Sequence, residues 1–446
     1  MGQSSQAGYV AFRTQSVAGT FPADFDTNAI AMKLRSGGIG VNRELMPPDP
    51  EIGGGRDIPD AYLGAVSWGG DLEFYTRFNA LLPLLNAALG LKYVKSPGGT
   101  NHTTVLTMTG APTGGTFTLT YSAQTTAALP YNATAGQIQA ALEALSNIGE
   151  GEVDVSGGPI NSAPISITWY GTLAGVITNP TANSAGLTGG TSPTITPTSG
   201  TVGAAYTTAV KHTFIPSDNA QLPFLGIQER IGASLETFNY KDAVVNTLHF
   251  EADADGYLMG TAGVIAREQT AGITGPADIL SRFDNLPMVV GTNITLTYNG
   301  VSLPAKSFSF DLNNNFEDDD YRLGSFYIGD LTPKRREITL GASIRETDSA
   351  LWRQAVYGSS VANTPGGLSA KAPFTITMQT YEVIPGESTR KYCLKLTFPQ
   401  VALSPYTLEA SGDDIIESDL EFQVLRPNAA RKIMYAEVDT DISAVA

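Results

Sequence analysis

The residue types that most often perform chemistry in proteins are few in this chain and widely separated. Its histidines are His102, His212 and His249, and Cys393 is its single cysteine. Zinc sites and nucleophilic triads need several such residues at fixed spacings, and the sequence has no HExxH, CxxC, GxSxG, Walker A or GxGxxG pattern. We therefore predict no catalytic residue, no cofactor site and no metal site, and we expect Cys393 to be a small core residue.

Two acidic segments have oxygen ligands at alternate positions, as a calcium loop does. In the segment from Asp311 to Asp319, however, Phe316 takes the place of the required glycine, and Arg322 that of the bidentate glutamate. We interpret this segment as a solvated or inter-subunit loop. Its candidate contact residues are Asn313, Asn314, Asn315, Glu317, Asp318, Asp319 and Asp320. The second segment, Glu251 to Gly256, is interpreted as the end of a β-hairpin with a turn at Asp255-Gly256.

The charge of the chain bears on its partners. The formal net charge is −16 and the pI is near 4.6. Electrostatic binding to nucleic acid needs clustered lysine and arginine, so we do not expect this chain to hold DNA. An acidic surface repels DNA, which suits a passage through which DNA must slide. Carboxylates are numerous enough for a hydrolytic pair, but nothing in the sequence singles one out.

Hydrophobic periodicity predicts many strands and a few short helices. Residues 62–75 alternate as a half-buried strand does, and residues 78–89 have apolar side chains at helical spacing before Gly90. The first sixty residues, rich in proline and glycine, predict a long arm or loop with one short strand at 29–34. Further strands are expected at 225–239, 244–251, 257–268, 294–298, 306–311, 336–344, 374–381, 392–398, 416–424 and 433–438, and short helices near 277–283 and 349–357. The pattern indicates a mainly β fold, a sandwich or barrel with short packed helices.

One long tract differs sharply from the rest in composition. Between Lys95 and Lys211 the chain has no lysine or arginine, and all 27 of these residues lie in the flanks. Strands are expected at 103–109, 116–121, 152–155 and 165–170, with a last one within 192–203, and a helix at 135–145 capped by Thr134. We predict an inserted small α+β domain at 103–204, set into a body formed by residues 1–102 and 205–446.

Several local patterns are shared with one protein family. In the body they are Arg43-Glu44-Leu45 with the Pro/Gly-rich loop after it, the segments 64–75, 81–90, 306–315, 321–325 and 330–340, and the last hairpin, 418–436. Through them the body resembles the major tail tube proteins of long-tailed, siphovirus-type bacteriophages, especially those of actinobacteria. Through residues 114–126, 138–145 and 187–194, the tract resembles a small decoration-type domain of phage structural proteins.

The resemblance implies a structural virion protein of the tail, made in the host cytoplasm, and not an enzyme. Six copies would form a ring, and stacked rings would form a hollow tube through which phage DNA passes without specific binding. The implied partners are further copies and the tape measure, terminator and distal tail proteins. Six copies at −16 give −96 per ring, and Glu73 and Glu236 are the lumen candidates. The tract would project outward.

Two other functions stay open at this level. The chain could be a β-rich virion or cell-surface adhesin with the tract as a glycan-binding module, although Met1 to Gln6 lacks the basic start and apolar stretch of an export signal. A hydrolase on a β scaffold is the third alternative. We expect no membrane insertion, because the longest apolar stretch, Ala80 to Leu91, contains Pro83 and Asn86 and is too short to span a bilayer.

Overall fold

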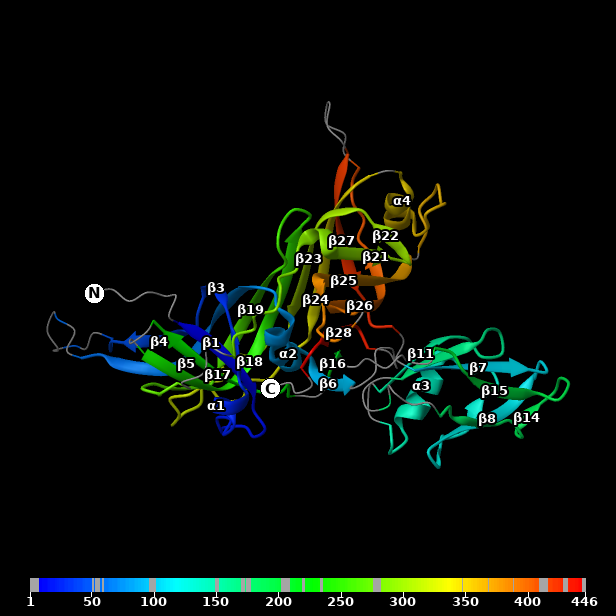
Figure 1. The fold of residues 1–446 in the computed structure, drawn as a ribbon, viewed down its shortest axis with the longest axis horizontal. Helices are drawn as coiled ribbons and strands as arrows, with labels where there is room; N and C mark the ends of the chain where they lie inside the picture. The colour runs from blue at the N-terminus through cyan, green and yellow to red at the C-terminus, as the bar shows by residue number, and fades with distance from the viewer. Residues whose placement is uncertain are drawn as a thin grey trace.

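The structure is a computed structural model. It describes residues 8–49, 52, 57, 60–95, 102–148, 152–169, 173, 178–201, 209–218, 221–232, 236–275, 282–346, 348–367, 369–387, 389–408, 416–427 and 432–442. The chain is mainly β, as the sequence predicts, and its described helices are short (Figure 1).

The elements fall into three groups along the chain. Before the tract they are β1 (Tyr9–Thr14), α1 (Phe25–Asn28), β2 (Ile30–Met32), β3 (Leu34–Gly37), β4 (Gly40–Met46), β5 (Tyr62–Tyr75), α2 (Phe78–Leu89) and β6 (Gly90–Lys95). In the tract they are β7 (Thr103–Thr109), β8 (Gly114–Tyr121), β9 (Gln124–Thr125), β10 (Leu129–Pro130), α3 (Ala135–Glu143), β11 (Val153–Gly157), β12 (Ile165–Trp169), β13 (Thr181–Asn183), β14 (Leu187–Thr188) and β15 (Thr194–Ser199). After the tract they are β16 (Val210–Pro216), β17 (Leu225–Ile231), β18 (Glu236–Asp253), β19 (Met259–Ala266), β20 (Glu268–Thr270), the 3-10 helix η4 (Gly291–Asn293), β21 (Ile294–Tyr298), β22 (Val301–Leu303), β23 (Ala305–Asn313), β24 (Glu337–Arg345), α4 (Ala350–Tyr357), β25 (Lys371–Val383), β26 (Lys391–Leu403), β27 (Glu417–Val424) and β28 (Tyr435–Thr440).

Two antiparallel sheets pack face to face in the body. The first sheet pairs β5, β19, β18, β23, β24 and β27 in that order. The second sheet pairs β21, β25, β26, β28, β16 and β6, and β27 also pairs with β26. The ring centroids of Phe310 (β23) and Phe398 (β26) lie 5.9 Å apart, and those of Phe374 (β25) and Phe422 (β27) lie 4.7 Å apart. These contacts place the core between the sheets, as in a β-sandwich.

The helix α2 begins and ends where its sequence predicts. Its apolar side chains are buried against β18, β16 and β28, and the chain leaves it through Gly90 at φ +96°. A side chain at that φ is strained, so glycine suits this helix end. In the tract, Thr134 caps α3 as predicted, and Gln137 completes a capping box with it.

Two sequence-based predictions about the body are wrong. The short strand expected at 29–34 corresponds to β2 and the start of β3, but the rest of the first sixty residues is not simply an arm or loop, because β1 and β4 also lie there and β4 pairs with β5. The strands expected at 225–239 and 244–251 are instead β17 and one long strand, β18, that runs through the expected gap. Asp242 interrupts the alternation there. It has φ +51°, and its buried carboxylate accepts hydrogen bonds from Gln15 Nε2 (2.9 Å) and Gly19 N (2.7 Å).

The predicted hairpin turn at Asp255-Gly256 is confirmed, because β18 and β19 form an antiparallel pair on either side of it. The helix expected near 277–283 falls mostly outside the described residues.

The tract leaves and re-enters the body at one point. Its flanking strands β6 and β16 form an antiparallel pair in which Lys95 is the backbone partner of Lys211. Within the tract, the first and last strands also pair, and Thr103 N donates to Thr201 O at 3.1 Å. A separate set of buried apolar side chains, all between Leu106 and Ile195, forms a core of its own. Topologically, the tract therefore occupies the position of a turn between β6 and β16.

Beside this junction, a buried histidine makes the fold sensitive to acid. His212 on β16 is fully buried, and its Nε2 lies 2.7 Å from the backbone oxygen of Ile442. Burial lowers the pKa of His212 from 6.5 to about 4. A lowered folded-state pKa means that its contribution to stability is present above pH 6.5 and is lost as the pH falls through about 4.

We expect the variant His212→Gln to lose less stability in acid than the natural protein. Between pH 6.5 and 4, the histidine should account for about 3 kcal/mol of the loss in unfolding free energy. Urea unfolding at several pH values, monitored by a spectroscopic signal from the body, measures how steeply the free energy of unfolding falls with pH for each protein. Equal slopes for the two proteins would contradict the assignment.

Candidate functional site

One face of the first sheet is buried and the other is open and polar. On β27, Ser418, Leu420, Phe422 and Val424 are buried, whereas Glu417, Asp419, Glu421 and Gln423 are exposed. The other strands of the sheet alternate in the same way because successive side chains of a strand point to opposite faces. The sheet therefore presents one continuous polar face, which we call the acidic face.

Strand register brings residues from distant parts of the chain together on the acidic face. The middle row across the sheet consists of Glu73, Thr261, His249, Asp311, Thr339 and Gln423, each directly paired with the next. A second row contains Asp253, Ser307, Ser343 and Asp419. Cross-strand partners of this kind lie about 5 Å apart, so the carboxylates form one surface.

The acidic face carries far more negative than positive charge. Its nine carboxylates are Asp71, Glu73, Glu251, Asp253, Asp311, Glu337, Glu417, Asp419 and Glu421. The cations against them lie at the edges. Arg35 Nη1 is 3.9 Å from Glu73, and Lys306 Nζ and Arg345 Nε lie 2.7 and 3.3 Å from Glu417. The hydrogen bond from Lys306 is the main reason that the pKa of Glu417 is lowered.

The acidic face is hollowed toward one end. A groove of about 460 Å³ lies between the β18–β19 hairpin and strands β23, β24 and β27. Its charged lining residues are Glu251, Asp253 and Asp419, with no lysine or arginine. A groove with this lining repels anions such as the phosphates of DNA.

His249 lies in the middle of the acidic face between two carboxylates. Its Nδ1 is 2.6 Å from Asp311 Oδ1, and its Nε2 is 3.4 Å from Glu251 Oε2. Among the described residues it forms no hydrogen bond with a serine, threonine or cysteine side chain. The arrangement therefore holds the histidine on the surface without supplying the nucleophile of a triad.

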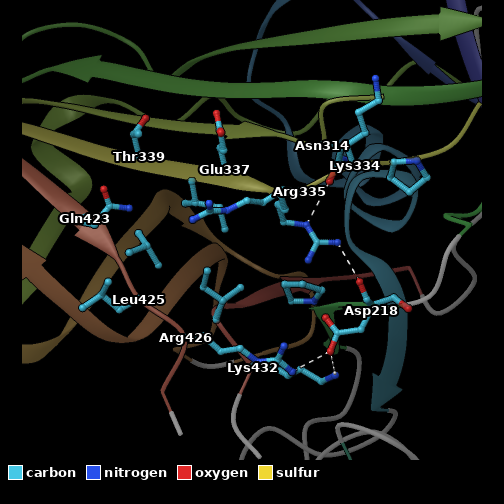
Figure 2. Close-up of a pocket in the computed structure, with 17 residues that line it drawn as sticks. Asp218, Asn314, Lys334, Arg335, Glu337, Thr339, Gln423, Leu425, Arg426 and Lys432 are labelled. Atoms are coloured by element: carbon cyan, nitrogen blue, oxygen red, sulfur yellow. Dashed lines mark hydrogen bonds and ion pairs between the residues drawn. The ribbon is translucent and has the colours of Figure 1, made fainter. Parts of the chain in front are cut away.

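The asparagine-rich loop after β23 is anchored within its own subunit. Asn314 is 1% exposed, and its amide donates to the backbone oxygens of Ala88 and Val245, both at 3.0 Å. Its side-chain oxygen accepts a hydrogen bond from Arg336 Nε at 3.2 Å, at the edge of the cleft drawn in Figure 2. Asn314 thus links α2, β18 and the start of β24.

The two neighbouring asparagines shape the same turn. Asn315 has φ +49°, a conformation that asparagine tolerates better than most residues. Its backbone N–H donates to Asn313 Oδ1 at 2.8 Å, and its amide donates to the backbone oxygen of Arg335 at 2.8 Å. These bonds give both residues a structural role, while their role in subunit contact stays a prediction.

The carboxylates of this loop are of two kinds. Glu317 lies 3.5 Å from Lys334 Nζ, and Asp320 lies 2.6 Å from Arg322 Nη2. Asp318 and Asp319 are exposed. Asp318 and Asp319 are therefore the loop carboxylates best placed to meet another molecule.

The two lumen candidates named from the sequence lie far apart. Glu73 is on the acidic face, where it accepts a hydrogen bond from Ser36 Oγ. Glu236 begins β18, pairs with Ile231 of β17 and accepts from Gly272 N at 2.7 Å, outside the acidic face. Its place in a lumen stays a prediction from the sequence.

Most of the acidic face has no predicted functional residue in the sequence. One signal was available: in Glu417, Asp419 and Glu421, a carboxylate recurs at every second position of a predicted strand. Such a period of two places all of them on one face.

The other candidate chemistry is dispersed. Cys393 is buried in β26 as predicted, and burial raises the pKa of its thiol to about 12. Across the part of the chain that the structure describes, no group of three or more histidine, cysteine, aspartate or glutamate residues is arranged to hold a metal ion. No helix of the described residues is long and apolar enough to cross a membrane.

The fold is a β-sandwich with one open acidic face, and comparison with known proteins shows the family to which it belongs. The model of the phage tail tube protein family matches residues 5–424, and the chain belongs to this family. It is therefore a structural protein of a bacteriophage tail.

A local similarity to a second tail protein also exists. The chain is 41% identical over 96 residues to the tail sheath protein of Mycobacterium phage Bxz1. The match covers 22% of this chain and 16% of that relative, so the chain spans only a small part of the relative's length.

Replacing Asn314 tests whether the loop after β23 is a structural anchor. We expect Asn314→Ala to lower the free energy of unfolding by roughly 3 kcal/mol, because it removes three hydrogen bonds and leaves buried backbone oxygens unpaired. The matched control Asp318→Ala, in the exposed part of the loop, should change it by less than about 0.5 kcal/mol. Chemical denaturation measures both, and similar values for the two variants would refute the anchoring role.

Proposed function

We propose that six copies of this protein form a ring, and that stacked rings form the hollow tail tube through which phage DNA passes. The observation that carries this proposal is the acidic face, a continuous anionic surface on one side of a tail tube family sandwich. In the tube, the first sheets of adjacent subunits close a β-barrel around the lumen, which removes their edges.

The charge of the acidic face explains how DNA moves without sticking. Six copies bring 6 × 9, or 54, carboxylates to one ring, with few cations against them. Duplex DNA carries about one negative charge per 1.7 Å of its axis. Like charges on the wall hold the duplex away from it, so no counterions are released and no bound state forms.

An exposed apolar surface on the β4–β5 ribbon supplies a subunit contact. Val41, Tyr62, Leu63 and Phe326 are all more than half exposed. Beside them lies a groove of about 630 Å³ whose lining is largely apolar, including Trp68. Exposed apolar surface of this kind marks a protein interface, and we assign it to an adjacent subunit of the tube. Asp318 and Asp319 are candidates for a further contact.

The tract, residues 103–204, is proposed to be an inserted domain that projects from the outside of the tube. It leaves the body through β6 and β16 of the second sheet, whereas the acidic face belongs to the first sheet (Figure 1). Its ends meet and it has its own core.

The proposed partners follow from this position in the virion. They are further copies of the chain, the tape measure protein, the terminator and the distal tail protein. We propose a long-tailed, siphovirus-type phage of actinobacteria as the source, and the match to a protein of a Mycobacterium phage supports the host group. Proteomics of virions that contain this protein tests the proposed phage type. A sheath protein in the same virions would contradict the siphovirus type.

Removing the tract tests its peripheral position. Residues 96–210 are replaced by a four-residue turn containing Asn-Gly, which joins the paired residues Lys95 and Lys211. We expect tubes with the ring repeat of the full chain and a smaller outer diameter in negative-stain electron microscopy. A folded protein that no longer forms tubes, while the full chain does, would show that the tract is part of the tube wall.

Reversing charges on the acidic face tests the DNA passage. The variant Asp71→Lys/Glu251→Lys/Glu421→Lys should assemble and then retain short duplex DNA in sedimented tubes, with retention lost as salt is raised. The matched control is Asp71→Asn/Glu251→Gln/Glu421→Gln, which removes the same charges without adding cations and should retain at least tenfold less DNA. Equal retention by both variants would mean that the face does not meet DNA.

A further inference from the structure

A cationic cleft lies at one end of the first sheet, in a chain whose net charge is −16 (Figure 2). Its volume is about 1120 Å³, and it lies between the start of β24, the end of β27 and the chain after β16. Five cationic side chains line it: Lys334, Arg335, Arg336, Arg426 and Lys432. Of the described residues, two carboxylates, Asp218 and Glu337, line it with them.

The cations of the cleft are only partly neutralised from within. Arg426 and Lys432 share Asp218, with nitrogen–oxygen distances of 2.9 and 3.6 Å. Arg336 is held by uncharged partners, since it donates to Asn314 and to the backbone oxygen of Ser217 at 3.0 Å.

Lys334 and Arg335 lie on the open side of the cleft, and both are exposed. Lys334 approaches Glu317 at 3.5 Å, a distance at which two exposed groups gain little. The cleft therefore presents an excess of positive charge to whatever enters it.

The opposite end of the same strands carries more carboxylates than cations, and its two cations, Lys306 and Arg345, both pair with Glu417. The cleft lies at the ends marked by Glu337 of β24 and Gln423 of β27. At the other end, Asp253 and Asp419 lie in one cross-strand row, and Asp255 extends beyond them in the exposed β18–β19 turn. The nine residues of β24 separate the two ends by roughly 25 Å.

We propose that the cationic cleft of one subunit receives the acidic β18–β19 turn, Asp253 to Asp255, of a second copy in the next ring. The proposal rests on the proposed tube and names the surfaces that stack its rings. Asp253 and Asp255 are exposed in a turn beside the acidic groove, and hydrogen bonds from Ala254 N to Lys306 O and from Gly291 N to Gly256 O hold this turn in place. The cleft is a concave surface of opposite charge. Arg335 and Arg426 face Asp253 and Asp255 in this contact, with Asp419 beside them.

This contact is head-to-tail, because each subunit offers a different surface at each end. A contact of this kind between unlike surfaces does not close on itself and produces a filament. Partial exclusion of water in the cleft strengthens the ion pairs, and salt screens them. Ring stacking should therefore weaken as ionic strength rises.

Two charge-reversal variants test the contact together. The cleft variant, Arg335→Glu/Arg426→Glu, has acidic surfaces at both ends, and the turn variant, Asp253→Lys/Asp255→Lys, has cationic surfaces at both ends. Each alone repels its own copies, so we expect at least a tenfold higher critical concentration for tubes. Mixed in equal amounts, they can alternate along the axis, and tubes should form again near the natural concentration.

A control variant and the possible negative results distinguish failure of the stacking contact from failure of the proposed tube function. Lys33→Glu/Lys391→Glu makes the same change in charge outside the cleft and should form tubes normally. If either reversal variant alone forms tubes as the natural chain does, the proposed stacking contact is wrong. It is also wrong if the mixture of the two variants forms no tubes. In both cases the proposed tube function still stands. If the natural chain forms no tubes at any concentration, the proposed function itself fails. A different result would identify the cleft as an anion-binding site and not a stacking contact. In that case the unassembled natural chain binds inorganic phosphate or duplex DNA through Arg335 and Arg426, and both reversal variants still form tubes.

Discussion

The register of the six strands of the first sheet is the constraint on which the rest of this structure depends. Each strand alternates apolar and polar side chains, so its position against its neighbours decides which side chains meet the core. A slip of one residue in β27 would turn Glu417, Asp419 and Glu421 into the core and Leu420 and Phe422 into solvent. Phe250 stacks on Phe310 within the first sheet, and Phe310 packs against the tilted ring of Phe398, which ties the register of the first sheet to the second. The same strand register therefore specifies both the buried core and the continuous acidic face.

Charge in this protein is separated along two directions. Across the sandwich, carboxylates gather on the open side of the first sheet, while the tract with almost no charge leaves through the second sheet. Along the strands, an acidic hairpin turn lies at one end and a cationic cleft at the other. The first separation suits a wall between a DNA passage and the outside, and the second suits a chain that stacks on itself. In the proposed tube, the first separation places the acidic face around the DNA passage, and the second stacks one ring on the next.

Much of the fold was predictable because local signals agreed with the tertiary structure. β5, α2 and α3 were predicted closely from alternation, helical spacing, Gly90 and Thr134. β4 was missed because all of its residues are exposed, so pairing with β5 leaves no hydrophobic pattern in it. The acidic face escaped for another reason. Its middle row joins Glu73, His249 and Asp311, and no local pattern indicates which strands pair or in which register.

The proposed function depends on the acidic face surrounding a passage for DNA. A helical reconstruction by cryo-electron microscopy of the tubes formed by the purified protein tests it directly. We expect Glu251, Asp311 and Glu421 to line the lumen, with the tract on the outside and the second sheet between them. A reconstruction that places these carboxylates on the outer surface, or buries them between subunits away from the lumen, would contradict it.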